Sequence, residues 1–538
     1  MSIIALARHA LHLASSVSPF VPSSVSRSAS LPVLPAAHRA LRHAHRRAYV
    51  GKRARAAIAL GLCAALAFAT PAEARKLRHR PSVSVSTELP PSVMRALTRA
   101  HVPLSSMSVV IERIGSSTPV IAVNAGKPML PASTMKLVTT YTGLEILGPD
   151  YRWRTRAYAD GTVDANGVLH GDLYIQGSGD PELVPEELID LVDRIRKDGI
   201  VGIDGALVLD KRFFDPSTRD LPAFDEDITA PYNVGPDPLL YAFKSLSFTL
   251  TPSQDGTVAI DVEPPLAQLK IDNALRARAG ACTSTEAATP NVTPEHDGTV
   301  EALFSGDYAL RCGARTVSLA VLDHTTFFAG GFLALWRQQG GTFNGTSHEG
   351  AVPASARLVA THEGRPLSDI VRDINKFSNN VMARNLFLTI GAVADKPPAT
   401  PEKSAQAIGQ FLRTHGLAMP ELALVNGSGL SREEHVSALS LADLLQSANA
   451  SPVAQTFVAS LPVAGVDGTM RNRLRHDPVL GNAHVKTGTL RDVRAIAGYV
   501  AAADGESYVV VSLINDEHAP AARAAHDALL DWVYRGLK

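Results

Sequence analysis

A serine and a lysine stand three residues apart in the string Ser133-Thr134-Met135-Lys136, at the start of a predicted helix. This spacing places the lysine amine beside the serine hydroxyl on one helix face. A serine hydroxyl is a weak nucleophile without a neighbouring base, and a lysine can be that base only if burial or nearby cations lower its pKa. The pair therefore predicts nucleophilic catalysis by Ser133 with Lys136 as base. The alternative is an N-cap serine followed by a surface lysine.

A second polar motif, Ser378-Asn379-Asn380, follows an apolar helix. A serine and an amide two residues apart in a loop could direct the Ser378 hydroxyl and the Asn380 amide into one cleft. The same Ser-x-Asn pattern occurs at Ser447-Ala448-Asn449, within a predicted helix. The alternative for either motif is a helix cap, so the pattern alone assigns no function.

A third motif, Lys486-Thr487-Gly488-Thr489, leads into the last predicted hairpin. On an edge strand, the Lys486 amine could supply positive charge beside a cleft, with the hydroxyls of Thr487 and Thr489 close by. Gly488 would let a substrate backbone approach the strand closely. The alternative is a solvated strand end.

Hydrophobic periodicity predicts the elements that would position these motifs. Strands at both ends of the chain, with helices between them, predict one domain completed by distant segments. Ser368 is the predicted N-cap of the helix before the second motif. The predicted strands are 107–111, 120–123, 495–502 and 508–514, and the predicted helices are 133–147, 368–377 and 520–537.

Residues 155–343 have a different sequence pattern, in which short strand-like segments alternate with Gly, Pro and Asp turns. They predict a mostly β insertion of one or two nested modules, which divides the catalytic domain into 96–154 and 344–538. The insertion holds Cys282 and Cys312, which could pair in an oxidising compartment or remain two separate buried thiols. Neither cysteine has zinc-ligand spacing, and no metal or cofactor is predicted.

The N-terminus carries an export pattern. Basic residues precede an apolar run from Ala56 to Ala69, and the string Thr70-Pro71-Ala72-Glu73-Ala74 ends it. A charged segment, a short apolar segment and a small-residue cleavage site are typical of a secretory signal. Residues 1–74 are therefore predicted to be an N-terminal extension with a signal cleaved near Ala74, residues 75–95 a flexible leader, and the location periplasmic.

The charge balance changes when this N-terminal segment is set apart. Lys and Arg total 52, as do Asp and Glu, but residues 1–74 hold nine basic residues and one acid. The remainder has 43 basic and 51 acidic residues, a net charge of −8. A mildly acidic body argues against nucleic acid as a partner, because phosphate binding needs a concentrated basic face.

The three motifs occur in the order that is the joint signature of class A β-lactamases and penicillin-binding proteins, with Asn379 in place of an Asp. The wider strings resemble class C low-molecular-mass penicillin-binding proteins over about residues 95–538. These proteins are D-alanyl-D-alanine carboxypeptidase/endopeptidases of the cell wall. The strings are Pro131–Leu137, Ile374–Asn380, Ser428–Arg432 and Lys486–Leu490.

The resemblance also accounts for the insertion. Ser378 lies 245 positions after Ser133, and this family carries extra domains in that gap. The implied fold is α/β (α+β), with an antiparallel sheet flanked by helices and a mostly β insertion.

The resemblance implies a role for each motif residue. Ser133 would attack the D-Ala-D-Ala carbonyl of a peptidoglycan stem peptide, and Lys136 would take its proton. Ser378 would relay a proton to the leaving amine while Lys486 holds the Ser378 hydroxyl. Asn380 would hydrogen-bond the substrate backbone.

Further residues would bind the substrate. The N–H groups of Ser133 and Thr489 would form the oxyanion hole, and Thr487 and Thr489 would contact the terminal carboxylate. A β-lactam would acylate Ser133 and leave slowly. Arg432 and Asp227 are candidate contacts to the diaminopimelate end of the stem peptide, or else surface ion-pair residues.

Two positions depart from what the resemblance implies. Arg491 stands near the cleft where a neutral polar side chain is expected, which puts the substrate pocket in doubt. Arg384 stands where an acid is expected, and we predict that it lies at the surface.

Two alternatives belong to other functional classes. A β-lactamase would need rapid deacylation, but no deacylating motif is found and the long insertion weighs against it. A non-enzymatic wall-binding protein on the same fold would be expected to have lost some of the catalytic residues, which are intact here. The sequence leaves open the oligomeric state, a loose membrane association and the balance between carboxypeptidase and endopeptidase activity.

Overall fold

The computed structural model describes residues 85–219, 222–282, 289–295 and 298–537. The predicted signal, its cleavage site near Ala74 and the leader before residue 85 lie outside the described residues. Within the described part, no helix is both long and apolar enough to cross a bilayer.

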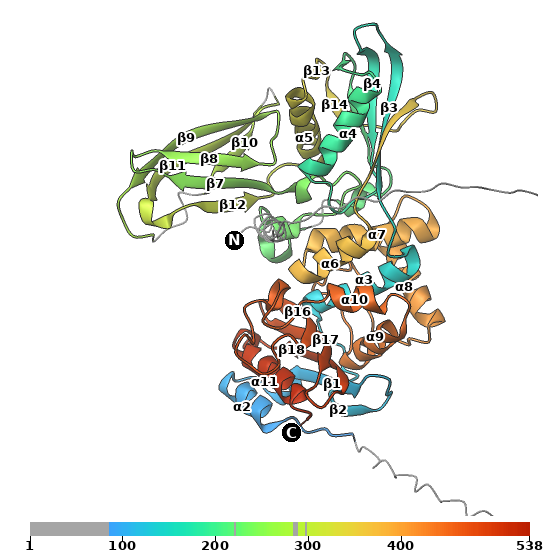
Figure 1. Ribbon diagram of the computed structural model, residues 1–538, viewed down its shortest axis with the longest axis vertical. Helices are drawn as coiled ribbons and strands as arrows, with labels where there is room; N and C mark the ends of the chain where they lie inside the picture. Colours follow the sequence, from blue (N-terminus) through green and yellow to red (C-terminus); the bar gives the residue numbers. More distant parts are fainter. Residues whose placement is uncertain (1–84, 220–221, 283–288, 296–297, 538) are drawn as a thin grey trace, which may run out of the picture. The chain divides into compact units, whose positions relative to one another are not determined.

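One sheet joins the two ends of the described chain. It consists of β1 (Met107–Arg113), β2 (Pro119–Val123), β16 (Ala483–Leu490), β17 (Val493–Ala501) and β18 (Ser507–Asn515). The order is β16-β17-β18-β1-β2 and every pairing is antiparallel (Figure 1). Because β1 pairs with β18 along its whole length, segments from both ends of the described chain complete one sheet.

Helices cover both faces of this sheet. Side chains of a strand alternate between its faces, and in β1 the residues Val109 and Ile111 join one hydrophobic core while Val110 joins another. The first core includes α2 (Pro91–Arg99) and α11 (Arg523–Tyr534). The second includes α3 (Lys136–Leu147), α6 (Leu367–Phe377), α7 (Asn380–Asp395), α8 (Pro401–Thr414), α9 (Ala438–Ala450) and α10 (Ala454–Ser460).

Three boundaries differ from the predictions. Helix α2 begins at Pro91, inside the predicted leader, because proline is well suited to the first helical position. Helix α6 begins at Leu367 after an extended Pro366, so Ser368 lies inside the helix and is not its N-cap. The predicted helix 133–147 begins as a 3-10 turn, η2 (Ala132–Met135), which continues into α3.

The insertion is mostly β, as predicted, and its first module is a seven-stranded sheet. Strand β15 pairs with β3, so the inserted sheet extends beyond the predicted end at residue 343. The chain returns to the catalytic domain at α6. The strands are β3 (Arg154–Val163), β4 (Val168–Gln176), β5 (Gly202–Ile203), β6 (Leu207–Asp210), β13 (Thr342–Phe343), β14 (Ser347–Glu349) and β15 (Arg357–Glu363), and the helices are α4 (Pro185–Lys197) and α5 (His324–Gln338).

A second module is nested within the first and contains two three-stranded sheets. The rings of Phe248 and Phe304, one from each sheet, meet edge to face with centroids 5.2 Å apart. A disulfide joins Cys282 to Cys312, which is the first of the two alternatives for these cysteines. One sheet holds β7 (Leu246–Pro252), β8 (Val258–Glu263) and β12 (Arg315–Leu319), and the other holds β9 (Leu269–Arg278), β10 (Asn291–Pro294) and β11 (Val300–Ala309).

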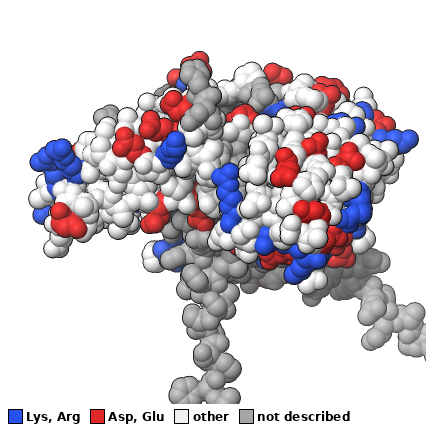
Figure 2. Space-filling view, turned by 90° about the horizontal axis from the view of Figure 1, so that it is seen from above, with Lys and Arg blue, Asp and Glu red and all other residues white. Residues whose placement is uncertain are grey.

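Charged side chains of both signs are interspersed over the face shown in Figure 2, apart from a small basic cluster at one edge.

Candidate active site

The candidate nucleophile lies where η2 runs into α3. Ala132, the residue before Ser133, is fully buried and has a φ of 46°, in the left-handed region that residues other than glycine seldom adopt. The turn brings Ser133 Oγ to 3.0 Å from the Nζ of Lys136, the first residue of α3. The structure therefore brings the first predicted pair into contact.

Lys136 is completely buried among polar atoms. Its Nζ lies 2.7 Å from Asn380 Oδ1 and 2.5 Å from the carbonyl oxygen of Ser428. Burial, followed by the positive charges of Lys486 and Arg384, holds the pKa of Lys136 well below its usual value. A neutral amine has two N–H groups and one lone pair. Since the amide and carbonyl oxygens can only accept, they take both N–H groups and leave the lone pair for the Ser133 hydroxyl.

The second motif forms the junction between α6 and α7. Ser378 ends α6 in a left-handed conformation with φ 59°. Asn379 caps α7 by accepting a hydrogen bond from the Met382 N–H at 3.1 Å. The cap is thus the middle residue, which leaves the side chains of Ser378 and Asn380 free to face the site.

The third motif lies on β16, the edge strand of the sheet. The buried Lys486 donates to Ser378 Oγ at 2.8 Å and to the Thr487 carbonyl at 3.0 Å. Burial lowers the pKa of Lys486 to about 7. The Thr487 hydroxyl lies 2.7 Å from that of Thr469, a residue that the sequence analysis did not single out.

Two glycines allow neighbouring backbone to press against the turn that carries Ser133. A Cβ on Gly488 would lie 2.7 Å from the Pro131 carbonyl oxygen, and one on Gly429 would lie 1.8 Å from that of Ala132. The close approach at Gly488 was predicted for a substrate backbone, but in the structure the protein's own backbone makes it. Any side chain at either position would displace the nucleophile.

The N–H groups of Ser133 and Thr489 are not used for pairing within η2 or with β17. The Ser133 N–H lies in the first turn of η2, where N–H groups have no partner within the helix. On β16, the Val485 N–H donates to the Pro462 carbonyl at 2.8 Å, away from β17. Because alternate residues of a strand present their N–H groups to the same side, the Thr489 N–H also faces the open edge.

Glu434, which the motifs did not predict, organises the loop that supplies the Ser428 carbonyl. This carboxylate has no exposed surface and accepts four backbone N–H groups at 2.7 to 3.0 Å. Its only sequence signal is an acid six residues after Ser428, just beyond the small residues of that loop.

The candidate diaminopimelate contacts do not meet. Arg432 pairs with Asp492 and, at 3.4 Å, with Asp225, and its guanidinium lies 5.0 Å from the centre of the Phe224 ring. Asp227 is exposed and receives long hydrogen bonds, of 3.4 and 3.5 Å, from its own loop. The structure therefore places Asp225, rather than Asp227, beside Arg432.

The two arginines that differ from the family's expected residues have different surroundings. Arg491 is exposed, next to Asp492. Arg384, predicted at the surface, is only 6% exposed and donates to the carbonyls of Asn233 and Val234 at 3.1 and 2.7 Å. That prediction is wrong because these carbonyls come from the insertion, about 150 residues earlier in the chain.

The second Ser-x-Asn string is not part of the site. It lies within α9, where the Ser447 hydroxyl is 3.0 Å from the hydroxyl of Tyr141.

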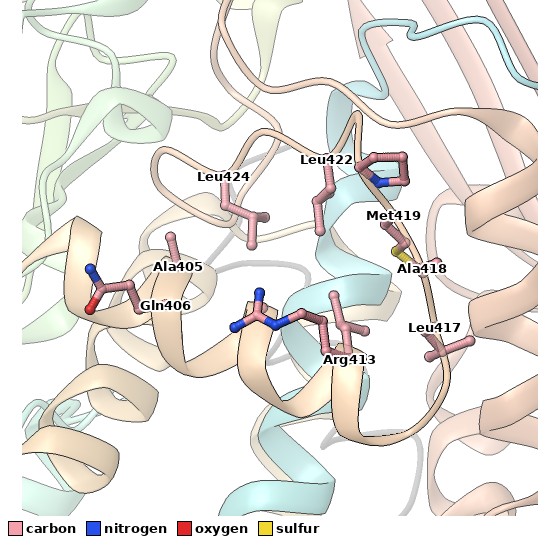
Figure 3. A pocket seen from close by; sticks show the side chains of 11 residues that line it. Ala405, Gln406, Arg413, Leu417, Ala418, Met419, Leu422 and Leu424 are labelled. Atoms are coloured by element: carbon pink, nitrogen blue, oxygen red, sulfur yellow. The ribbon is translucent and has the colours of Figure 1, made fainter.

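The three motifs share a cavity of about 350 Å³. A larger pocket of about 650 Å³ lies elsewhere, where Leu422 and Leu424 on a loop face Ala405 and Arg413 on α8 (Figure 3). None of the larger pocket's lining residues belongs to a motif. No group of His, Cys, Asp and Glu suited to a metal ion occurs among the described residues. The smaller cavity is lined by Ser133, Ser378, Thr469, Asn472, Arg473, Thr487, Gly488, Thr489, Arg494, Ala495, Arg523 and His526.

Known proteins share the sequence and the fold. The D-alanyl-D-alanine carboxypeptidase of Actinomadura sp. (strain R39) is 32% identical over 78% of this chain and 80% of its own length. D-alanyl-D-alanine carboxypeptidase DacB of Haemophilus influenzae is 28% identical over 76% of this chain and 85% of its own. The crystal structure of penicillin-binding protein 4 from H. influenzae matches with a TM-score of 0.68 and 26% identity, over 82% of this chain and 99% of that one.

Residues 91–535 match the D-Ala-D-Ala carboxypeptidase 3 (S13) family. The resemblance to penicillin-binding carboxypeptidases is thereby confirmed, together with the fold that it implied. The family match spans nearly all of the described residues, and the nucleophile and base of its motifs are in contact here. The chain therefore belongs to the D-Ala-D-Ala carboxypeptidase 3 (S13) family and is a serine-type D-Ala-D-Ala carboxypeptidase.

Proposed function

We propose that this enzyme cleaves peptidoglycan stem peptides through an acyl-enzyme on Ser133. It removes terminal D-Ala from pentapeptides and also hydrolyses D-Ala–diaminopimelate cross-links. The observation that supports this most directly is the buried Lys136 amine, 3.0 Å from Ser133 Oγ and occupied on its other sides by oxygen acceptors.

Acylation begins when the neutral Lys136 amine takes the Ser133 proton as Oγ forms a bond to the carbonyl carbon. The carbonyl oxygen becomes an oxyanion that accepts hydrogen bonds from the Ser133 and Thr489 N–H groups. Losing one such donor typically costs about 10²–10³ in rate.

The leaving amine needs a proton as the C–N bond breaks. The Ser378 hydroxyl gives its proton to the amine and takes one from the Lys486 ammonium, 2.8 Å away. Because the pKa of Lys486 is about 7, this lysine can lose and regain a proton near neutral pH. The acyl-enzyme then carries a protonated Lys136 and a neutral Lys486.

Deacylation reverses these transfers with water in place of the amine. Water attacks the ester carbon and gives its proton through Ser378 to Lys486, and the departing Ser133 oxygen recovers a proton from Lys136. Both lysines return to their starting states, so the cycle consumes only water.

Substrate contacts extend from this centre. Thr487 and Thr489 hold the terminal carboxylate. The Asn380 side chain donates one N–H to the Tyr232 carbonyl at 3.2 Å, and its second N–H is left for the substrate backbone. Arg432 with Asp225 forms the wall toward the diaminopimelate end.

The proposed location is the periplasm, reached through the N-terminal signal. The proposed inhibitors are β-lactams, which resemble the peptide amide and acylate the same serine. Support comes from the solved complex of H. influenzae penicillin-binding protein 4 with a β-lactam, which is 25% identical to this chain over 83% of it.

Labelled penicillin tests the nucleophile. Wild-type protein and a Ser447→Ala control should be labelled covalently, whereas Ser133→Ala should not; equal labelling of all three would overturn the assignment. Digestion of purified peptidoglycan, with products identified by mass, tests both cleavages. Rapid turnover of a chromogenic cephalosporin would instead indicate a β-lactamase.

A further inference from the structure

Beyond the motif residues, the catalytic cavity is lined by three arginines and a histidine. We call this region, defined by Arg473, Arg494, Arg523 and His526, the basic chamber. Arg494 is the β17 residue directly opposite Thr489. Arg523 and His526 lie in the first turn of α11. The chamber thus begins where the proposed carboxylate contacts end.

The positive charge of the chamber is poorly compensated. Arg473 pairs with Asp527 at 2.5 Å, and no acid lines the cavity. Arg494 donates from Nη1 to the carbonyls of Leu490 and Val493, both at 2.7 Å, while its buried Nε has no hydrogen-bond partner. Arg523 is exposed, and no ion pair joins it to any described residue. Three guanidinium groups and one carboxylate leave a net charge of about +2, since arginine stays protonated.

Burial and neighbouring charges lower the pKa values of two groups in the chamber. Burial, followed by the charges of Arg473 and Arg494, lowers the pKa of His526 to about 3. Burial, followed by Arg523, lowers the pKa of Arg494. His526 is only 2% exposed, and its Nε2 atom also lacks a partner. A neutral imidazole with an unsatisfied nitrogen therefore lies among cations, beside a cavity.

Such an arrangement is costly for the folded protein alone, because like charges repel and buried polar atoms without partners are unfavourable. An anionic ligand in the cavity would relieve the repulsion between the arginines. Guanidinium groups suit carboxylates in particular, because their planar N–H donors match two oxygens at once.

We propose that the basic chamber binds carboxylates of an acidic peptide leaving group, beyond the carboxylate next to the scissile bond. This inference rests on the proposed function. A terminal D-Ala has one carboxylate, and Thr487 and Thr489 bind it. A cross-linked stem peptide leaves as a larger group with further carboxylates, and these reach Arg494 and Arg523. The chamber therefore favours cleavage of cross-links over removal of terminal D-Ala.

The experiment compares two substrates, a pentapeptide monomer and a cross-linked muropeptide dimer, with full-length enzyme. Arg494→Gln and Arg523→Gln should each lower kcat/KM for the dimer roughly tenfold or more. They should change kcat/KM for the pentapeptide less than about threefold, because a terminal D-Ala has no further carboxylate for the chamber to bind. Arg471→Gln, which removes an exposed charge outside the cavity, is the matched control and should leave both values unchanged.

A product-binding measurement separates recognition from folding. The stem tripeptide released from a cross-link should inhibit the wild-type enzyme competitively, and its Ki should rise about tenfold in Arg494→Gln. The melting temperature of Arg494→Gln should change little, because the repulsion that is removed offsets the two hydrogen bonds lost to the Leu490 and Val493 carbonyls.

Several results would overturn the chamber as a leaving-group site: equal losses on both substrates, no loss on the dimer, or an unchanged Ki for the tripeptide. The proposed function fails separately, if wild-type enzyme is not labelled by penicillin at Ser133 or does not hydrolyse the pentapeptide.

Discussion

The interior of the catalytic domain and the inserted segment reach the same site through different kinds of contact. In the interior, Lys136 and Lys486 are completely buried, and each amine is held by two or three oxygen atoms. The insertion contributes an exposed loop at 222–234, which offers backbone carbonyls and partly exposed carboxylates. None of its residues lines the catalytic cavity.

We expect this difference to separate the residues that carry the chemistry from those that recognise the substrate. Burial lowers a lysine pKa by favouring the neutral amine, which is what a proton acceptor needs. On the exposed loop, water and salt weaken the attraction between charges. Substitutions in the interior should therefore change the reaction by orders of magnitude, and substitutions on the insertion side by small factors.

The largest effect should follow from removing the base. Lys136→Ala should lower the rate of acylation by penicillin about 10²–10⁴-fold, the usual contribution of general base catalysis. Lys136→Arg should lose a similar factor, because a guanidinium stays protonated and cannot accept the Ser133 proton. The measurement is the rate of covalent labelling under single-turnover conditions.

Lys127→Ala provides the matched control, since Lys127 is an exposed lysine whose Nζ donates to the Ser105 carbonyl at 2.8 Å. Its labelling rate should equal that of wild type. Retention of rapid labelling by Lys136→Arg would show that the site needs a cation there rather than a base.

The pH profile should show how the two regions are coupled. The rate should rise as pH increases through the lowered pKa of Lys136, which must be neutral, and fall as pH increases through about 7, where Lys486 loses its proton. Arg384 is one of the charges that hold the Lys136 pKa down. Arg384→Gln should therefore raise that pKa and move the acid limb to higher pH. A shift of about one pH unit would slow acylation about tenfold on that limb.

Arg384→Lys is the control for this profile because it keeps the charge while losing the paired N–H donors. It should leave the acid limb nearly in place. If both variants moved the acid limb equally, the effect would come from the lost hydrogen bonds to the Asn233 and Val234 carbonyls rather than from the lost charge.

Arg384 also shows where sequence reasoning reaches its limit. Local periodicity predicted four strands of the catalytic domain and three of its helices, but not α2, α7, α8 or α10. The spacing of Ser133 and Lys136 is enough to place both on one side of a turn. Burial of Arg384 depends on the carbonyls of Asn233 and Val234. No local pattern predicts that partner, because it lies in another module.

Other contacts were not predicted for the same reason, namely that the partner is set by the packing of distant elements. The tight approach at Gly488 was predictable, but its partner, Pro131, depends on how η2 packs against β16. The arginines at 473, 494 and 523 are spread over fifty residues and converge only through the sheet and α11. Asp225 pairs with Arg432 in place of Asp227 because of the local turn at Asp225, whose φ is 54°. In each case the residue type could be read from the sequence, whereas its neighbour could not.

A smaller effect is expected on the insertion side of the site. Arg432→Gln should lower kcat/KM for diaminopimelate-containing peptides about three- to tenfold, because its ion pairs with Asp225 and Asp492 are about one-third exposed. Acylation by benzylpenicillin, which lacks the stem peptide, should be unchanged. Arg471→Gln should alter neither rate. A loss of a hundredfold or more, or an equal loss with penicillin, would place Arg432 in the chemical step.

The smallest effect on activity should come from the disulfide of the insertion. Removing Cys282–Cys312 by a Cys282→Ser/Cys312→Ser double substitution opens a loop of 30 residues and should destabilise the nested module by roughly 3–4 kcal/mol on the chain-entropy model. Since that module supplies no residue to the cavity, penicillin labelling at 25 °C should keep its wild-type rate. Thermal unfolding monitored alongside labelling distinguishes the two quantities: a lower melting temperature with unchanged acylation is expected. A slower acylation at a temperature where the protein remains folded would instead mean that the nested module helps to position the 222–234 loop, and that the division between chemistry and recognition is less complete than the contacts indicate.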